Sequence, residues 1–280
     1  MNTIVFGDNL PVLREFAAGS VDLVVTDPPF NTGSRRRHTR LRVHHSPDGE
    51  RVGFAGRRYA AVRIGSASFA DCFDDYLAFL EPRLREIHRV LAPHGTLYLH
   101  LDPREAHYCK VLLDTIFGRN CFLNEIIWAY DYGGRSRRRW PAKHDTILVY
   151  VRDPERYFFD ADAVDRIPYL APSLVGPEKA ALGKRLTDTW WHTIVPTSGK
   201  ERTGYPTQKP LAIVRRMIAA SSAPGALVLD PFAGSGTVGA ACLALGRRFF
   251  LIDNNPDALR VMERRFAHCA DIEWRGWPLT

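Results

Sequence analysis

At 280 residues the chain is long enough to bury a substantial core, and its length fits one large α/β domain that carries an insertion. The formal net charge of +7 favours a polyanionic partner, because a basic surface attracts polyanions and releases their counterions. No apolar run approaches the ~20 residues that span a bilayer, and no basic segment followed by an apolar core opens the chain. We therefore expect neither a membrane protein nor a secreted one, and a cytoplasmic location.

The cysteines are five in number, widely spaced and without any Cys-x-x-Cys pair. They are Cys72, Cys109, Cys121, Cys242 and Cys269. We interpret them as small apolar residues of the core, and expect neither a disulfide framework nor a zinc site. The pair His44-His45 has no nearby cysteine or histidine that would complete a metal cage, so no metal is expected.

Strand-like and helix-like patterns alternate along the chain. The predicted strands are Thr3–Phe6, Asp22–Thr26, Gly95–Leu101, Phe122–Trp128, Asp145–Val151, Ala226–Asp230 and Phe249–Asp253. The predicted helices are Asp74–Leu91, Arg104–Phe117, Thr207–Ser222, Thr237–Leu245 and Pro256–Ala267. This alternation is typical of a mostly parallel, seven-stranded sheet that is covered by helices on both faces.

Two long segments interrupt the alternation. Asn31–Ser68 is rich in arginine, glycine and histidine and has no sustained period, so a long basic loop is expected there. Asp153–Gly204 is irregular and contains Trp190-Trp191, which are either core residues or contacts to a ligand. Loops of this length in a compact domain are usually functional or disordered.

The tetrapeptide Asp27-Pro28-Pro29-Phe30 follows an apolar strand directly. The two prolines hold the backbone so that acceptor groups converge on one point. An exocyclic amine is a poor nucleophile because its lone pair is delocalised into the base. The Asp27 carboxylate and the Pro28 carbonyl can accept hydrogen bonds from this amine and thereby favour a more nucleophilic nitrogen. Phe30 offers a ring for stacking. No cysteine follows a proline, which counts against methylation of a ring carbon.

A second motif, Asp230-Pro-Phe-Ala-Gly-Ser-Gly-Thr237, turns from strand into helix. Its glycines allow positive φ and a close approach of the backbone to a ligand. A carboxylate at this point repels phosphate and suits a cation such as S-adenosylmethionine. The expected contacts come from Asp230, Phe232, Gly234, Ser235, Gly236 and Thr237.

Two further acidic residues end strands and are candidates for the same ligand. Asp253 stands where an acidic residue binds ribose hydroxyls, and its alternative is to cap the helix that begins at Pro256. Asp8 could receive an adenine amino group, although Asp8 or Asn9 could equally cap the helix that starts near Leu10.

The order of the motifs predicts a circular permutation. In a doubly wound nucleotide fold the glycine loop closes the first strand, whereas here it comes late and only the strand Phe249–Asp253 follows it. The next strand of such a fold is then supplied by Thr3–Phe6, at the N-terminus. A permuted fold requires that its two termini are adjacent.

Together the two motifs resemble those of the β-class, permuted amino-methyltransferases of bacterial restriction–modification systems and related orphan enzymes. The resemblance covers nearly the whole chain. Further matching segments are Gly7-Asp8-Asn9, Arg89–His100, Lys143-His144-Asp145 and Glu201–Pro210.

The resemblance implies a Rossmann-like, S-adenosylmethionine-dependent methyltransferase fold. Residues 1–152 form its catalytic part with the basic loop 31–68, residues 153–204 the target-recognition insertion, and residues 205–280 the cofactor-binding part. By resemblance, Thr207-Gln208-Lys209-Pro210 begins a helix beside the methionine end of the cofactor, which makes Lys209 a cofactor residue.

The expected function is methylation of an amino group of a flipped-out base in double-stranded DNA. Adenine N6 is favoured because an aspartate at the head of the tetrapeptide is more usual in adenine enzymes. Cytosine N4 is the alternative, and RNA or a protein glutamine is a more distant one. A nicotinamide-dependent oxidoreductase is disfavoured by the short glycine motif. A non-catalytic nucleic-acid-binding module would need neither motif, yet both are intact.

The expected partners follow from this function. Phosphate contacts are expected from Arg135, Arg137, Arg138 and Arg139 and from the basic loop, whereas sequence specificity is expected in Asp153–Gly204. A homodimer and a cognate restriction endonuclease are two further possible partners.

Overall fold

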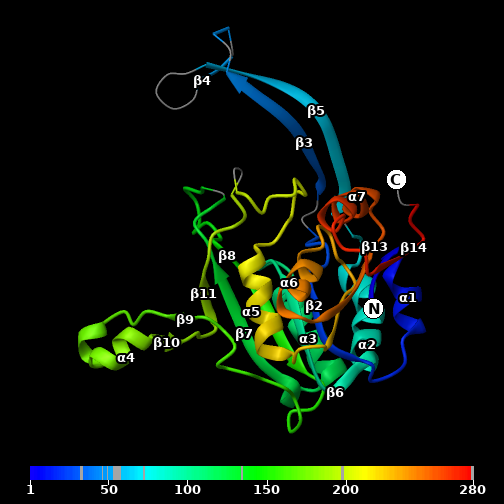
Figure 1. The fold of residues 1–280 in the computed structure, drawn as a ribbon, viewed down its shortest axis with the longest axis vertical. Helices are drawn as coiled ribbons and strands as arrows, with labels where there is room; N and C mark the ends of the chain where they lie inside the picture. The colour runs from blue at the N-terminus through cyan, green and yellow to red at the C-terminus, as the bar shows by residue number, and fades with distance from the viewer. Residues whose placement is uncertain are drawn as a thin grey trace. The chain divides into compact units, whose positions relative to one another are not determined.

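The chain divides into two compact units in the computed structural model: residues 1–30 with 75–280, and residues 31–74. The structure describes residues 1–31, 34–45, 47–48, 50–52, 58–71, 73–133, 135–196 and 199–278. Figure 1 labels the helices and strands and colours the chain from blue at the N-terminus to red at the C-terminus.

The larger unit is built on one sheet, in which nine strands can be followed among the described residues. Their order across the sheet is β11, β7, β8, β6, β2, β12, β13, β1, β14. The strands are β1 (Asn2–Phe6), β2 (Val21–Thr26), β6 (Leu91–Leu101), β7 (Phe122–Ala129), β8 (His144–Val151), β11 (Thr189–Trp191), β12 (Leu227–Asp230), β13 (Arg248–Asp253) and β14 (Ile272–Arg275).

Neighbouring strands run parallel except at β8, which is antiparallel to both β6 and β7. All seven predicted strands are confirmed. The two additional strands, β11 and β14, lie at the sheet edges and are short. A strand of three or four residues offers too few alternations for its period to be read from the sequence.

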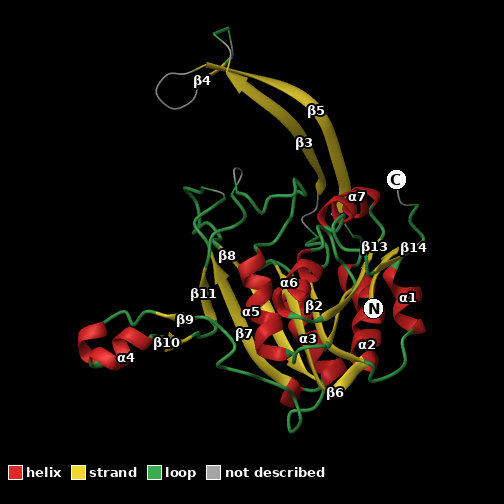
Figure 2. Ribbon diagram, viewed as in Figure 1, coloured by secondary structure: helices red, strands yellow, loops and turns green. Residues whose placement is uncertain are grey.

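Six helices of the larger unit connect these strands: α1 (Asn9–Glu15), α2 (Tyr76–Val90), α3 (Ala106–Phe117), α5 (Leu211–Ser221), α6 (Thr237–Leu245) and α7 (Pro256–Arg265). Contacts join α1 to α2, α2 to α3, and α5 to α6. Since crossover connections between parallel strands are right-handed, the strand order puts α1, α2 and α3 on one face and α5, α6 and α7 on the other. The helices flank the sheet in Figure 2.

The N-terminal strand confirms the permutation. β1 lies between β13 and β14 and pairs in parallel with both, with Thr3 opposite Phe250 and Asn2 opposite Ile272. The first strand of the chain therefore completes the part of the sheet that its last two strands form.

Residues 31–74 form an antiparallel β-sheet, and the expectation of an irregular loop at Asn31–Ser68 is wrong. β3 (Ser34–His45) pairs with β5 (Arg58–Asp71), and β4 (Arg51–Val52) pairs with the start of β5. The pattern was missed because β3 carries arginine or histidine at most positions. A strand with no apolar face lacks the alternation that identifies strands in a sequence.

The segment 153–204 is irregular, as expected, with short elements. These are β9 (Arg166–Ile167), a 3-10 turn (Pro172–Leu174), α4 (Pro177–Leu182), β10 (Lys184–Arg185) and β11. β9 and β10 pair with each other, whereas β11 pairs with β7 of the main sheet. The last part of the segment thus belongs structurally to the sheet.

Apolar side chains from the sheet and both helical layers form the core. Cys109, Cys121 and Cys242 are buried and Cys269 is half-buried, all as free thiols, whereas Cys72 lies outside the described residues. In the part of the chain that the structure describes, no helix is long and apolar enough to cross a membrane. Within that same part, no group of three histidine, cysteine or acidic side chains is arranged to hold a metal.

The two adjacent tryptophans of β11 have opposite environments. Trp190 is 7% exposed and its indole N–H donates to the Thr187 carbonyl over 2.8 Å, whereas Trp191 is 72% exposed. We therefore expect Trp190→Ala to lower the free energy of unfolding by about 3 kcal/mol and Trp191→Ala by less than about 0.5 kcal/mol. Urea denaturation of the two variants measures both values. Equal losses would show that β11 does not pack as described.

Candidate active site

Acidic side chains gather at one edge of the sheet because of the strand directions. Parallel strands bring their carboxyl ends to the same edge, where ligands bind in open α/β sheets. β8 runs the opposite way, so its first residues reach this edge too. The acidic residues that follow from this arrangement are Asp8 after β1, Asp27 after β2, Asp102 after β6, Asp145 at the start of β8, Asp230 at the end of β12 and Asp253 at the end of β13.

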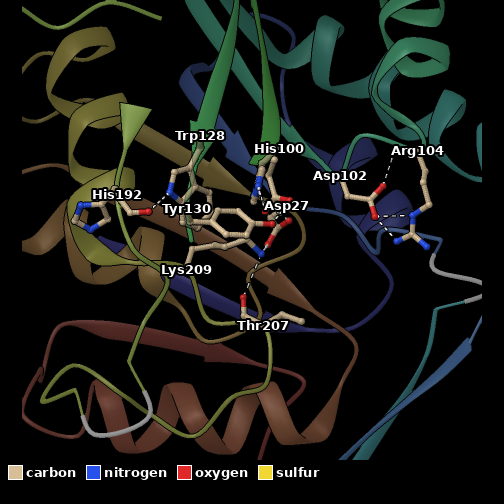
Figure 3. A network of polar contacts seen from close by, with 10 residues as sticks. Asp27, His100, Asp102, Arg104, Trp128, Tyr130, His192, Thr207 and Lys209 are labelled. Atoms are coloured by element: carbon tan, nitrogen blue, oxygen red, sulfur yellow. Dashed lines mark hydrogen bonds and ion pairs between the residues drawn. The ribbon is translucent and has the colours of Figure 1, made fainter. Parts of the chain in front are cut away.

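The Asp27 carboxylate is held from two sides (Figure 3). His100 Nδ1 lies 3.2 Å from Asp27 Oδ1, and the Lys209 ammonium forms an ion pair with Asp27 Oδ2. Lys209 Nζ also donates to the Thr207 carbonyl over 3.2 Å. Burial alone would raise the pKa of Asp27, but the positive charges of Lys209 and His100 outweigh it and lower that pKa. Asp27 is therefore an ionised acceptor at neutral pH.

His100 connects Asp27 to a second carboxylate. It lies in β6, is 5% exposed, and its Nε2 is 3.2 Å from Asp145 Oδ2. The Tyr130 hydroxyl donates to Asp145 Oδ1 over 3.0 Å. Burial opposes the charged imidazolium, but Asp27 and Asp145 outweigh burial and raise the pKa of His100. The protonated ring can donate to one carboxylate with each nitrogen.

The sequence analysis gave no role to His100, Asp145 or Tyr130. His100 and Asp145 lie in segments that carry the family resemblance, and that was the available signal. Their connection to Asp27 depends on β6 lying between β2 and β8 in the sheet. Sequence spacing cannot show this neighbourhood.

Aromatic rings line the same network. The Phe30 ring meets the His100 ring edge-on with centroids 5.3 Å apart, and the Lys209 ammonium lies 4.9 Å from the Phe30 centroid. The ring centroids of Trp128 and His100 are 5.5 Å apart. Pro28 is buried and Pro29 is half-buried. The structure thus brings the tetrapeptide, β6 and the Lys209 segment together.

The glycine loop is shaped by its backbone. Gly234 and Gly236 have φ of +50° and +70°, which favours glycine. The Gly234 N–H donates to Asp253 Oδ2 over 2.7 Å. At Gly236 a Cβ would lie 2.8 Å from Met262 Cγ, so helix α7 leaves no room for a side chain.

The missing side chain of Gly234 leaves room for Tyr205. A Cβ on Gly234 would lie 3.2 Å from the Tyr205 ring. The missing side chain therefore also serves internal packing. The neighbouring hydroxyls of Ser235 and Thr237 are 3.0 Å apart, and Arg265 donates to Thr237 Oγ1 over 3.1 Å.

Asp230 is the most perturbed carboxyl of the glycine loop. It is 4% exposed, and its Oδ1 accepts the Phe232 N–H over 3.1 Å. Burial raises the pKa of Asp230 to about 8, and the nearby Asp27 charge acts in the same direction. Burial also raises the pKa of Asp253 to about 6. Asp230 is therefore mostly protonated near neutral pH, and a cation would stabilise its anionic form.

The structure shows which of the two acidic residues at the strand ends caps a helix. Asp253 does not cap α7, because Asn255 is the N-cap and accepts the Asp257 N–H over 2.9 Å. Asp8 caps α1 through Leu10 N at 3.1 Å. Ribose and adenine contacts of these two residues stay predictions, as do the ligand contacts of Phe232, Ser235 and Thr237.

Lys209, which was predicted to lie beside the cofactor, forms an ion pair with Asp27. Another contact that the sequence did not predict comes from Asn9, whose side-chain amide donates to the Pro231 carbonyl over 2.7 Å. Arg83 Nε in turn donates to Asn9 Oδ1 over 2.6 Å. The end of β1 is thereby fixed to the glycine loop.

The four arginines that are predicted to contact phosphates do not take part in this network. Arg135, Arg137, Arg138 and Arg139 are exposed in the loop between β7 and β8.

A family model named N6_N4_Mtase and described as DNA methylase matches residues 21–264 of this chain. Type II methyltransferase M.HpaI of Haemophilus parainfluenzae is 30% identical over 274 residues, which are 98% of this chain and 76% of that protein. DNA adenine methyltransferase YhdJ of Escherichia coli is 30% identical over 276 residues, covering 94% of this chain and 82% of that protein.

Solved structures share the fold. The cytosine-N4-specific PvuII DNA methyltransferase gives a TM-score of 0.65 at 15% identity, covering 95% of this chain and 86% of that one. The M1.HpyAVI–SAM complex gives 0.60 at 20% identity, covering 95% and 99% of the two chains. At these identities the likeness shows the α/β fold alone.

The raised pKa of His100 makes the stability of the site pH-dependent. The pKa of His100 is 6.5 when the chain is unfolded and higher when it is folded. Its contribution to the free energy of unfolding is therefore complete below pH 6.5 and is lost as the pH rises through the folded pKa. We expect the difference in free energy of unfolding between wild type and His100→Gln to shrink from about pH 6 to about pH 9. Urea denaturation at several pH values measures it. A constant difference would contradict the imidazolium.

Proposed function

The chain belongs to the DNA methylase family of N6-adenine and N4-cytosine methyltransferases, and on this premise we propose that it methylates adenine N6 in duplex DNA with S-adenosylmethionine as donor. The observation that carries the proposal is the ionised Asp27 carboxylate at the end of β2, held by His100 and Lys209. When bound, S-adenosylmethionine supplies an electrophilic methyl group.

The residues at the glycine loop fit a cationic cofactor. Asp230 is buried with a pKa raised to about 8, so a positive ligand would stabilise its anionic form. The Asp253 carboxylate accepts the Gly234 N–H and is thereby joined to the same loop. A pyrophosphate would instead be repelled here. Asp230 and Gly234–Thr237 would hold the cofactor from the sheet edge, and Asp253 its ribose.

Asp27 acts on the amine of the target base. Its carboxylate accepts a hydrogen bond from the N–H, and the Pro28 carbonyl accepts the second, which draws the nitrogen toward a tetrahedral and more nucleophilic form. A carboxylate has about four acceptor sites, so Asp27 can keep His100 and Lys209 while it binds the amine. When the nitrogen has gained its methyl group it must release one proton, for which Asp27 is the acceptor.

His100 and Lys209 position Asp27. Two cations on the two oxygens fix the plane of the carboxylate and keep it ionised. Fixed acceptors need no reorganisation during the reaction, and alignment supplies much of the rate enhancement in a transfer of this kind. Phe30, beside both cations, offers the ring on which the target base would stack.

Adenine is proposed over cytosine on two grounds. The tetrapeptide begins with aspartate, and the relative YhdJ is named an adenine methyltransferase. The same acceptors would serve cytosine N4, for which the PvuII enzyme provides a structural likeness. RNA and protein glutamine are more distant alternatives.

Binding of duplex DNA is proposed to involve three segments. Residues 31–74 contain nine arginines, no lysine and four acidic residues, a net charge of +5 out of +7 for the chain. With Arg135–Arg139 they would contact phosphates, and 153–204 would read the target sequence. A homodimer, a cognate endonuclease and a cytoplasmic location stay predictions.

Nucleoside analysis tests the base and the role of Asp27 together. Unmethylated bacterial DNA treated with the protein and S-adenosylmethionine should yield N6-methyl-2′-deoxyadenosine on digestion and mass spectrometry. Asp27→Ala should lose at least ~10³-fold of the rate because the amine loses its acceptor. Calorimetry with the cofactor controls for folding. Formation of N4-methylcytosine instead would select the alternative base, and retained activity in Asp27→Ala would contradict the mechanism.

Asp230 should make cofactor binding pH-dependent. Because its pKa is raised to about 8, binding of a cation below that pH must displace a proton. Affinity for S-adenosylmethionine, measured without DNA, should rise by up to about tenfold per pH unit between about pH 6 and about pH 8 and then level off. Asp230→Asn should remove most of this slope. The same slope in the variant would assign it to another group, such as Asp253.

A further inference from the structure

The loop between β7 and β8, residues 130–143, carries an exposed tryptophan. Trp140 is 96% exposed, more than Trp191 at 72%. Tyr132 in the same loop is 65% exposed. Single exposed apolar residues are common, but a fully exposed indole among basic residues suits a partner that offers both stacking and negative charge.

The base of this loop is tied to the catalytic network. Tyr130 N donates to the Lys143 carbonyl over 2.9 Å, and Lys143 Nζ donates to the carbonyls of Asp131 and Gly133 over 2.9 and 3.1 Å. Tyr130 also holds Asp145, the partner of His100. The loop therefore starts and ends at the residues that position Asp27.

The basic residues of the loop flank Trp140. Ser136 Oγ accepts the N–H groups of Arg138 and Arg139, both over 3.2 Å, which makes a compact turn. Among the residues that the structure describes, Arg135, Arg137, Arg138 and Arg139 form no ion pair within the chain. Four uncompensated guanidinium groups next to an indole match the charge of a nucleic-acid backbone.

We propose that Trp140 is a wedge that enters the duplex at the target and fills the place of the base that moves to Asp27. The arginines beside it would hold the phosphates of the same step. Proteins that open a duplex insert apolar side chains between bases, and removing a base from the stack costs a few kcal/mol that such contacts offset. The proposal rests on the proposed function, because it concerns DNA whose target base is flipped out.

Another exposed aromatic residue lies outside this setting. Tyr108 is 64% exposed and lies in helix α3. Helix α3 belongs to none of the three segments proposed to bind DNA. Tyr108→Ala is therefore a matched control that removes an exposed ring outside the proposed wedge.

The test compares Trp140→Ala, Trp140→Phe and Tyr108→Ala on two DNA substrates. One is a fully paired duplex, and the other has an abasic site opposite the target base, which lowers the cost of flipping. Trp140→Ala should lose about 10- to 100-fold of the methylation rate on paired DNA and less than about threefold on the abasic duplex. Trp140→Phe should keep most of the activity, and Tyr108→Ala all of it.

A second readout follows flipping directly. With 2-aminopurine at the target position, wild type should raise the fluorescence on binding, and Trp140→Ala should not. Equal losses on both duplexes, or no loss on paired DNA, would overturn the wedge, including the case in which Trp140 serves a protein partner instead. Failure of the proposed function would look different, because wild type would then methylate neither duplex. Circular dichroism checks that the variants fold.

Discussion

The partly buried ion pairs around Asp27 are the interaction on which the rest of the site depends. A carboxylate taken out of water is costly unless charged partners compensate it, and here the partners are His100 and Lys209. Such pairs often add little net stability, because desolvation cancels much of the attraction. They do fix orientation and protonation state, so their value at this place is chemical. Removing one partner would leave an uncompensated buried charge.

The neighbourhood of the two motifs follows from the sheet. β2 lies between β6 and β12, with Leu23 opposite Val228 on one side and opposite Thr96 on the other. The acceptor carboxylate is therefore flanked by the strand that carries His100 and by the strand that leads into the glycine loop. Circular permutation leaves this order unchanged, since it changes only where the chain begins. The Asp27 carboxylate and the glycine loop thus meet through strand order and without any adjacency in the sequence.

Periodicity and motif spacing were enough to predict the seven longer strands, the main helices and the permutation. They could not predict that Lys209 lies on Asp27, because the two are 182 residues apart and meet only when β2 and the segment before α5 reach the same edge. The hairpin of residues 31–74 was missed for another reason, since arginine and histidine occupy most positions of β3. The roles of Gly234 and Tyr205 depend on packing between segments, which composition does not reveal.

Acidic side chains gather at the catalytic edge, whereas most of the net positive charge belongs to another segment of the chain. That edge presents Asp27, Asp230 and Asp253, which suit an amine and a cationic cofactor but would repel a phosphate backbone. Residues 31–74 carry +5, which leaves +2 for the other 236 residues. Attraction to a polyanion must therefore come from segments outside the catalytic network, such as the hairpin and the β7–β8 loop. Under the proposed function, carboxylates act on the base and guanidinium groups bind the duplex, so the two tasks would be carried by different parts of the chain.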